Sequence, residues 1–276
     1  MDLAAEIERN VRAALAEDLG GGDVTAPLIP SGKRVRAVVL CRQDAVVCGQ
    51  PWFERTLRQL DPAVQIAWDV PEGAIVAAGA RVCSVQGEAR ALLAAERVAL
   101  NFLQTLSGVA SVTRRHVEAV AGTRAKIVDT RKTLPGLRLA QKYAVRVGGG
   151  SNHRLGLYDA MLIKENHIAA AGGIRQAVTQ ARKLANHGDW IQVEVENLDQ
   201  LREALDADAT MILLDNMSVE RMREAVKIAG DRAELEASGG ITLENARAIA
   251  ETGVHRMSVG ALTKDLKAAD FSMRFE

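Results

Sequence analysis

The segment from residue 131 to residue 154, RKTLPGLRLAQKYAVRVGGGSNHR, contains six lysines or arginines and one histidine but no acidic residue. The whole chain carries 35 basic and 35 acidic residues, so the excess of cations is local. Arginine binds a carboxylate through two parallel hydrogen bonds, and lysine presents a compact charge. The segment therefore suits a polyanionic small molecule, although a solvated surface run is the ordinary explanation of clustered charges.

Acidic residues follow two later apolar segments. In IQVEVE, the period of two along a strand places Gln192 and Glu194 on the same face, and MILLDN ends in Asp215. A polar face on a buried strand is costly unless it meets a cation, a metal or a substrate. Glu194 and Asp215 suit Mg²⁺, which takes a few carboxylates together with waters and substrate phosphates. Simple pairing of these acids with Lys164 and Arg131 is the alternative.

Small residues end two further segments. SGGIT places Ser238, Gly239 and Gly240 just before a helix start at Thr242, and HRMSVGA ends near Gly260. Exposed backbone N–H groups at a helix N-terminus favour an anion, and α/β barrels often bind phosphate after their late strands. The glycines therefore predict a phosphate site, with a plain left-handed turn as the alternative.

The elements that would position these residues form two unlike parts. Residues 3–18 predict a helix, and residues 33–90 predict short β-strands. Apolar spacing of three and four predicts a helix over 91–107, where Gly108 allows a break before a second helix. From residue 126 onward, strand-like segments alternate with amphipathic helical ones, which indicates a parallel sheet with right-handed crossovers.

The second part is expected to be an α/β barrel. Its strand-like segments have polar C-terminal ends, which open onto one mouth in a closed or nearly closed barrel. An open doubly wound sheet is the alternative, but the glycines at 148–150 lack the spacing of a dinucleotide-binding motif. We expect domains at 1–110 and 111–265, with residues 266–276 returning to the first.

Composition argues against several classes of protein. A formal net charge of zero disfavours a general nucleic-acid or membrane partner. No apolar run reaches membrane-spanning length, and the N-terminal residues lack an apolar signal core. Cys41, Cys48 and Cys83 match neither a zinc site nor a disulfide scaffold, so we expect reduced thiols in a cytoplasmic protein.

Taken together, these motifs closely resemble the quinolinate phosphoribosyltransferase family. The resemblance covers nearly the whole chain and is carried by EDLGGGDVTAPLIP, ERVALNFLQTLSG, DTRKTLPGLRLAQKYAVRVGGGSNHRLGLYDAMLIKENH, EVEN, LLDN and EASGGI. It implies a type II phosphoribosyltransferase fold, with an N-terminal α/β sandwich and an incomplete, seven-strand-like α/β barrel. It also implies that quinolinate and phosphoribosyl pyrophosphate (PRPP) react, with loss of CO₂, to nicotinate mononucleotide and pyrophosphate in NAD biosynthesis.

The resemblance implies a role for each candidate residue. Lys132 would lie between quinolinate and PRPP, and the quinolinate carboxylates would be bound by Arg131, His153, Arg154 and Lys164. The ribose and a Mg²⁺–pyrophosphate would face Glu194 and Asp215, and the 5-phosphate would be held by Ser238, Gly239, Gly240 and Gly260. Catalysis would fall to Lys132, Lys164, Glu194 and Asp215, with one of the two lysines or a water as the proton donor to the decarboxylated ring carbon.

The resemblance further implies a homodimer or larger assembly in which each site is completed by Arg97 of a neighbouring subunit. The pattern alone favours the alternative, in which Arg97 pairs with a neighbouring acid on the surface of its helix. Three other functions fit the residues: a paralogue associated with molybdenum transport, a Schiff-base aldolase using Lys164, and a non-catalytic anion-binding module.

Overall fold

The computed structural model describes residues 2–185 and 190–276, which fall into two compact units. Unit 1 comprises the residues up to 114, 133–149 and 263–276, and unit 2 comprises 115–132 and 150–262. The division expected from the sequence differs from this one, because it keeps 133–149 in the barrel domain. Tyr143 of that segment donates its hydroxyl to Glu72 at 2.9 Å, a contact within unit 1.

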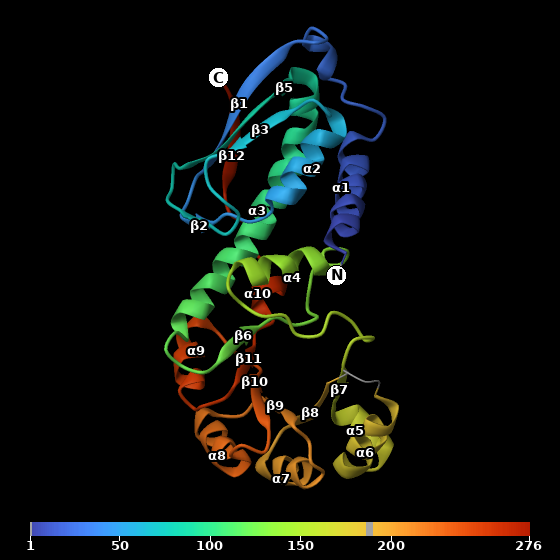
Figure 1. The fold of residues 1–276 in the computed structure, drawn as a ribbon, viewed down its shortest axis with the longest axis vertical. Helices are drawn as coiled ribbons and strands as arrows, with labels where there is room; N and C mark the ends of the chain where they lie inside the picture. The colour runs from blue at the N-terminus through green and yellow to red at the C-terminus, as the bar shows by residue number, and fades with distance from the viewer. Residues whose placement is uncertain (1, 186–189) are drawn as a thin grey trace. The chain divides into compact units, whose positions relative to one another are not determined.

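Unit 1 contains a four-stranded antiparallel sheet in the order β12-β1-β5-β3, together with a small two-stranded sheet (Figure 1). The larger sheet consists of β1 (Arg34–Cys41), β3 (Gln65–Trp68), β5 (Arg81–Glu88) and β12 (Phe271–Phe275). The smaller sheet pairs β2 (Ala45–Val46) with β4 (Ile75–Val76). Because β12 pairs with β1, the last residues of the chain add an edge strand to the first unit.

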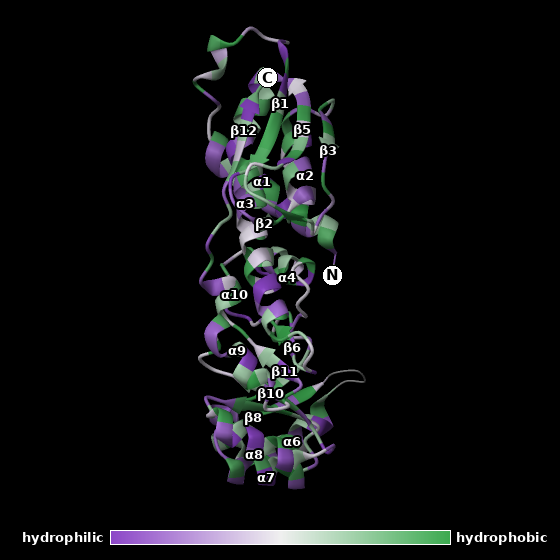
Figure 2. Ribbon diagram, turned by 90° about the vertical axis from the view of Figure 1, so that its left-hand side faces the viewer, coloured by the Kyte–Doolittle hydropathy of each residue, from purple (hydrophilic) through white to green (hydrophobic). Residues whose placement is uncertain are grey.

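The remaining regular elements of unit 1 are helical. They are α1 (Leu3–Leu19), the short η1 (Ala26–Leu28), α2 (Gln50–Leu60), most of α3 (Ala89–Ala119) and α4 (Arg138–Val147). Alternate residues of β1, including Ala37 and Val39, meet Phe53 of α2 and Leu103 of α3 in one buried cluster. Figure 2 shows β1 mostly in the colour of apolar residues, as a strand packed under two helices requires.

Helix α3 continues through Gly108 without the break that the sequence allowed. A side chain at this position would place its Cβ only 2.4 Å from the backbone oxygen of Lys267. The glycine therefore allows α3 to lie close to the segment that leads into β12. The sequence analysis considered Gly108 only as a possible helix break, because this contact joins residues far apart in sequence.

Replacing Gly108 with alanine is expected to lower the midpoint of thermal unfolding. The new methyl group would meet a backbone atom, which cannot move aside by changing rotamer as a side chain can. Overpacking of this kind costs roughly 1–3 kcal/mol, and a chain of this size loses about 2–4 °C for each kcal/mol. Gly21→Ala is the control, since no atom lies within 4 Å of its Cβ position. Equal unfolding midpoints for the two variants would contradict the close-approach explanation.

Unit 2 contains a six-stranded parallel sheet in the order β6-β11-β10-β9-β8-β7 (Figure 1). Its strands are β6 (Lys126–Val128), β7 (Met161–Ile163), β8 (Ile191–Val195), β9 (Met211–Asp215), β10 (Glu234–Ser238) and β11 (Arg256–Ser258). Strands β7 to β11 lie side by side in chain order, and the first strand returns beside the last. This is the order of a barrel, not of a doubly wound sheet.

The barrel of unit 2 is incomplete within the described residues. Ser151 adds a single parallel bridge beside β6, while β7 pairs only with β8. The connections are supplied by α5 (Glu165–Ala171), α6 (Ile174–Leu184), α7 (Leu198–Asp206), α8 (Val219–Ala229) and α9 (Leu243–Ala250), and α10 (Ala261–Lys264) follows the last strand of the barrel. The predicted α/β fold with an incomplete barrel is therefore confirmed.

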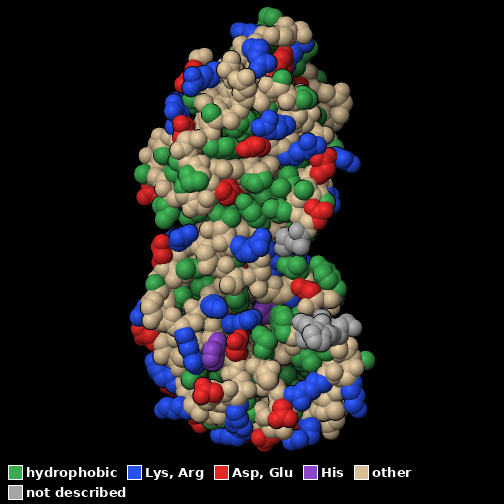
Figure 3. All heavy atoms as spheres, viewed as in Figure 1, with side chains coloured by type: hydrophobic (Ala, Val, Ile, Leu, Met, Phe, Trp, Pro, Cys, Tyr) green, Lys and Arg blue, Asp and Glu red, His purple; other side chains and the backbone are tan. Residues whose placement is uncertain are grey.

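The surface carries mixed charges. On the face drawn in Figure 3, Lys and Arg side chains of the described residues are interspersed with Asp and Glu and form no continuous basic patch. None of the described helices is long and apolar enough to cross a membrane.

Candidate active site

A cavity of about 500 Å³ opens at the C-terminal ends of the strands of unit 2. Of the predicted site residues, those that line it are Arg131, Lys132, His153, Arg154, Lys164, Glu194, Asp215, Ser238, Gly239 and Gly240. These residues come from six loops and strand ends spread over more than 100 positions of the chain. The barrel topology brings them together because its strands all end at one mouth.

Two of the lining residues form an ion pair. Lys164, which directly precedes α5, donates from Nζ to Oε2 of Glu194 in β8 at 2.6 Å. Burial raises the pKa of Glu194, the hydrogen bond and charge of Lys164 oppose that rise, and the charges of Asp215 and Glu165 add to it. The pairing that the sequence left as an alternative to ligand binding is thus present, and it lies inside the cavity.

Replacing Lys164 with methionine is expected to move the acid limb of the kcat/KM–pH profile to higher pH. The variant loses the ammonium that lowers the Glu194 pKa, while burial and the Asp215 charge, which raise it, remain. Glu194 then stays protonated up to a higher pH, and the protonated form lacks the negative charge that the reaction needs. The profile of the residual activity measures this shift, and Lys183→Met on the exposed face of α6 should leave the limb in place.

Two arginines of the cavity influence each other electrostatically. Burial lowers the pKa of Arg154, the nearby charge of Arg131 lowers it further, and Asp159 opposes both effects. The Asp159 carboxylate is already bound to the backbone N–H groups of Leu155 and Gly156, at 2.7 and 3.0 Å. The buried Nε of Arg131 has no hydrogen-bond partner among the described residues. Such a pair is suited to a ligand with two negative charges.

The cations of the segment from 131 to 154 are divided between the two units. Arg131, Lys132 and Arg154 line the cavity, whereas α4 carries the others within unit 1. There, Arg138 donates to Thr133 Oγ1 at 3.2 Å. The six cations are therefore less clustered in space than in the sequence, and about half of them line the cavity.

The glycine turn after β10 has the geometry of an anion-binding loop. Gly239 and Gly240 have φ angles of +93° and +61°, and a Cβ at Gly239 would lie 2.0 Å from Oδ1 of Asn216. The next residues begin α9, whose first turn is capped by Thr242 and Asn245. Successive residues of this kind turn backbone N–H groups toward one side, next to the positive end of a helix.

Two predicted residues do not line the cavity. Gly260 lies beside it, since a Cβ there would be 3.2 Å from Cδ of Lys132. Arg97 is an exposed residue of α3 and belongs to unit 1.

The cavity also has lining residues that the sequence analysis did not select. Among them are Asn216, Thr130, Ser258 and Glu236. Glu236 is 1% exposed and lies two residues before Ser238 in β10. The same alternation that identified Glu194 in β8 marks Glu236 as inward-facing, so the signal was present in ELEAS.

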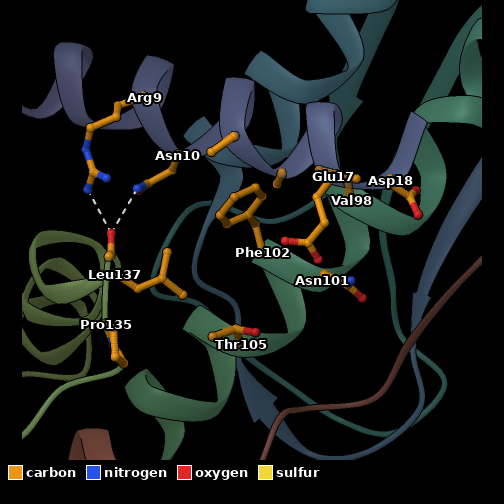
Figure 4. A pocket seen from close by; sticks show the side chains of 13 residues that line it. Arg9, Asn10, Glu17, Asp18, Val98, Asn101, Phe102, Thr105, Pro135 and Leu137 are labelled. Carbon is orange, nitrogen blue, oxygen red and sulfur yellow. Dashed lines mark hydrogen bonds between the residues drawn. The ribbon is translucent and has the colours of Figure 1, made fainter. Parts of the chain in front are cut away.

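Unit 1 has a cavity of its own, of about 360 Å³, between α1, α3 and the turn at 135–137 (Figure 4). The side chains of Arg9 and Asn10 both donate to the carbonyl oxygen of Gly136, at 2.7 and 3.2 Å. Arg9 also pairs with Glu6, at 2.7 Å. Its cation thus has structural partners, and the groups able to do chemistry converge in unit 2.

The donor set fits a magnesium ion that is shared with a substrate. The described residues contain no group of three or more His, Cys, Asp or Glu side chains arranged to hold a metal on their own. Mg²⁺ bound with substrate phosphates needs only one or two protein carboxylates. Glu194 and Asp215, which end neighbouring strands and influence each other electrostatically, supply that number.

Comparison with known proteins agrees with this architecture. Models of the quinolinate phosphoribosyl transferase N-terminal and C-terminal domains match residues 23–107 and 109–274. A probable nicotinate-nucleotide pyrophosphorylase (carboxylating) of Bacillus subtilis is 43% identical, over 93% of this chain and 89% of its own length. The structure of the nicotinate-nucleotide pyrophosphorylase from Francisella tularensis superposes with a TM-score of 0.95 and 47% identity, covering 99% of this chain and 96% of that one. The resemblance seen in the sequence is confirmed, and the chain belongs to the quinolinate phosphoribosyl transferase family.

Proposed function

We propose that this protein transfers a phosphoribosyl group from PRPP to quinolinate with loss of CO₂, forming nicotinate mononucleotide and pyrophosphate for de novo NAD synthesis. The observation that carries this proposal is one cavity that holds an arginine pair, an acidic pair and a glycine turn, in a chain of this family. An aromatic diacid, a developing sugar cation and a phosphate are the three groups that these features match.

Quinolinate binds through its two carboxylates to Arg131 and Arg154, with Lys132 beside it on the PRPP side. The support is the lowered pKa of Arg154, to which the charge of Arg131 contributes, and the buried Nε of Arg131, which has no hydrogen-bond partner among the described residues. Arginine is suited to this task because its planar fork matches a carboxylate in two parallel hydrogen bonds. Both ring nitrogens of His153 already contact protein groups, so the ring does not bind a carboxylate in the way that the two arginines do.

PRPP places its 5-phosphate on the loop of Ser238, Gly239 and Gly240, with Gly260 nearby, and its ribose faces Glu194 and Asp215. The C–O bond to pyrophosphate breaks and the ring nitrogen forms a C–N bond at the anomeric carbon. Positive charge that develops on the ribose is stabilised by the two carboxylates. A Mg²⁺ at this site would be held by Glu194 and Asp215, and it would neutralise charge on the leaving group.

Decarboxylation follows from the charge left on the ring. Once the nitrogen is quaternary, the C–C bond to the 2-carboxylate breaks, CO₂ leaves, and the electron pair stays on carbon beside the cationic nitrogen. That carbon then takes a proton from Lys132, Lys164 or a water. Substitution of the true donor by alanine lowers kcat more than it changes the KM for quinolinate, and unchanged kcat in both lysine variants would reject the assignment to a lysine.

A homodimer or larger assembly completes the site, with Arg97 contributed by a neighbouring subunit. The support is that Arg97 is exposed on α3 and lies outside the cavity-lining set of its own chain. A cytoplasmic location is supported by the cysteines, which are all free and buried.

The direct test is to mix the protein with quinolinate, PRPP and Mg²⁺ and to measure nicotinate mononucleotide, pyrophosphate and CO₂. Equal amounts of the three products are expected, and no product should form when nicotinate replaces quinolinate. Product from nicotinate, or none from quinolinate, would overturn the proposal. Borohydride trapping with a carbonyl substrate separately tests the aldolase alternative, which needs Lys164 as a neutral amine and not in its ion pair with Glu194.

A further inference from the structure

Three buried side chains form a hydrogen-bonded row at the bottom of the cavity of unit 2, which His153 and Glu236 line. Gln192 of β8 and Glu236 of β10 are each 1% exposed, and His153 is 8% exposed. Gln192 and Glu236 lie two residues before Glu194 and Ser238 on their strands, so they form the layer directly below the mouth. A carboxylate buried in this layer is costly, and the reaction described above does not use it.

The hydrogen bonds in this row have a defined direction. The backbone N–H of Arg154 donates to Nδ1 of His153 at 2.8 Å, so Nδ1 acts as an acceptor and the ring hydrogen lies on Nε2. Nε2 is 3.0 Å from Oε1 of Gln192, and Nε2 of Gln192 donates to Oε2 of Glu236 at 3.1 Å. Each donor meets an acceptor from the Arg154 backbone to the Glu236 carboxylate, and His153 is neutral in this arrangement.

Glu236 determines which way the row points. An ionised carboxylate only accepts hydrogen bonds, so only the amino end of the Gln192 amide can face it. The carbonyl end must then face His153, which requires the hydrogen on Nε2 and leaves Nδ1 to accept from Arg154. The second oxygen of Glu236, Oε1, lies 3.6 Å from Nε2 of His153 and accepts no hydrogen bond from the described residues. The negative charge therefore favours the same tautomer of the ring.

The histidine is held on its other sides as well. Its backbone N–H donates to Oδ1 of the fully buried Asp129, just after β6, at 2.9 Å. Trp190 packs edge-on against the ring, with centroids 4.9 Å apart. Because these contacts fix the position of the ring, the tautomer decides whether the Arg154 N–H has an acceptor. Nδ1 can accept this hydrogen bond only when the ring hydrogen is on Nε2.

We propose that Glu236 and Gln192 are positioning residues for the acceptor substrate: acting through His153, they fix the backbone of Arg154 and so the guanidinium that binds a quinolinate carboxylate. The inference rests on the proposed function for the identity of that substrate. It assigns His153 the role of a neutral connector between a buried carboxylate and the binding loop, where the family resemblance implied a direct contribution to the carboxylate pocket.

The test uses Glu236→Gln, Gln192→Leu and, as a matched control, Glu234→Gln. Glu234 lies in the same strand, pairs with Arg256 at 3.3 Å and has a 53% exposed side chain. We expect the first two variants to raise the KM for quinolinate about tenfold, the effect of one lost charge-assisted hydrogen bond, with the KM for PRPP within about twofold of the wild type. The ¹⁵N signals of the His153 ring, assigned with His153→Gln, should lose the single Nε2–H pattern.

Several outcomes would overturn the inference. These are a quinolinate KM within about twofold of the wild type in both variants, an equal rise in the KM of both substrates, or an unchanged ring tautomer. Should Glu236→Gln not fold, Gln192→Leu decides alone. Direct titration of the wild type and the variants with quinolinate, and the ¹⁵N spectra, need no turnover. They therefore test the row even if the wild type forms no nicotinate mononucleotide, which is the result that would reject the proposed function itself.

Discussion

Replacing Glu194 with glutamine is expected to lower kcat by a factor of about 10²–10³, the usual effect of removing one preorganised group that stabilises transition-state charge. The carboxylate is largely buried and is held by Lys164 at 2.6 Å, so it is in place before the ribose becomes cationic. Glutamine keeps the shape and loses the charge. Because the stabilisation is needed only in the transition state, the KM for PRPP should change much less than kcat.

Glu196→Gln is the matched control for this prediction. Glu196 follows the same strand, but it is exposed and does not line the cavity. Its steady-state constants should remain close to those of the wild type. A Glu194→Gln enzyme with wild-type kcat and a raised KM for PRPP would show that Glu194 acts in ground-state binding alone.

The combination with Asp215→Asn tests whether the two acids act on the same charge. Residues that act as a unit give effects that are not additive. If both carboxylates stabilise one developing cation, the double variant should lose less activity than the product of the two single losses. A fully multiplicative loss would indicate separate roles, one toward the ribose and the other toward the proposed magnesium ion.

Much of the site could be predicted because its signals are local. A strand buried on both faces reads as a short apolar run, so a polar residue at its C-terminal end stands out, as Asp215 does in MILLDN. Once the alternation of strands and helices indicates a parallel barrel, all such ends must meet at one mouth. The cavity then follows from the fold, and this is why residues far apart in sequence were placed in one site.

What could not be predicted depends on contacts between distant segments. The continuity of α3 through Gly108 is explained only by the approach of Lys267. The place of α4 in unit 1 depends on partners such as Glu72. Predicting the row from Glu236 to His153 requires knowing that inward side chains of β8 and β10, the two neighbours of β9, meet inside the barrel, which the period of two in either strand does not reveal.

Replacing Arg154 with methionine is expected to raise the KM for quinolinate by about 100-fold and, at the same time, to raise the midpoint of thermal unfolding of the substrate-free protein. The loss in binding corresponds to about two charge-assisted hydrogen bonds. The gain in stability follows from the lowered pKa of Arg154: burial and the charge of Arg131 both disfavour its charged form before a ligand binds. A methionine of similar length keeps the apolar contacts and removes this cost.

Quinolinate itself should stabilise the wild type through the same charges. A ligand that binds only the folded state raises the unfolding midpoint in proportion to the logarithm of its concentration over Kd. We expect this rise in the wild type and its near-absence in Arg154→Met at the same concentration. Differential scanning fluorimetry with and without quinolinate, in the absence of PRPP, measures both quantities.

Arg256→Met is the control that separates the two effects. Arg256 also lies in unit 2, but it has an acidic partner, Glu234, at 3.3 Å. Its loss should leave the quinolinate KM unchanged and should not raise the unfolding midpoint. If Arg154→Met instead destabilised the substrate-free protein more than Arg256→Met does, the mutual repulsion of Arg131 and Arg154 would not be a property of the empty site. Anion binding would then have to be explained without it.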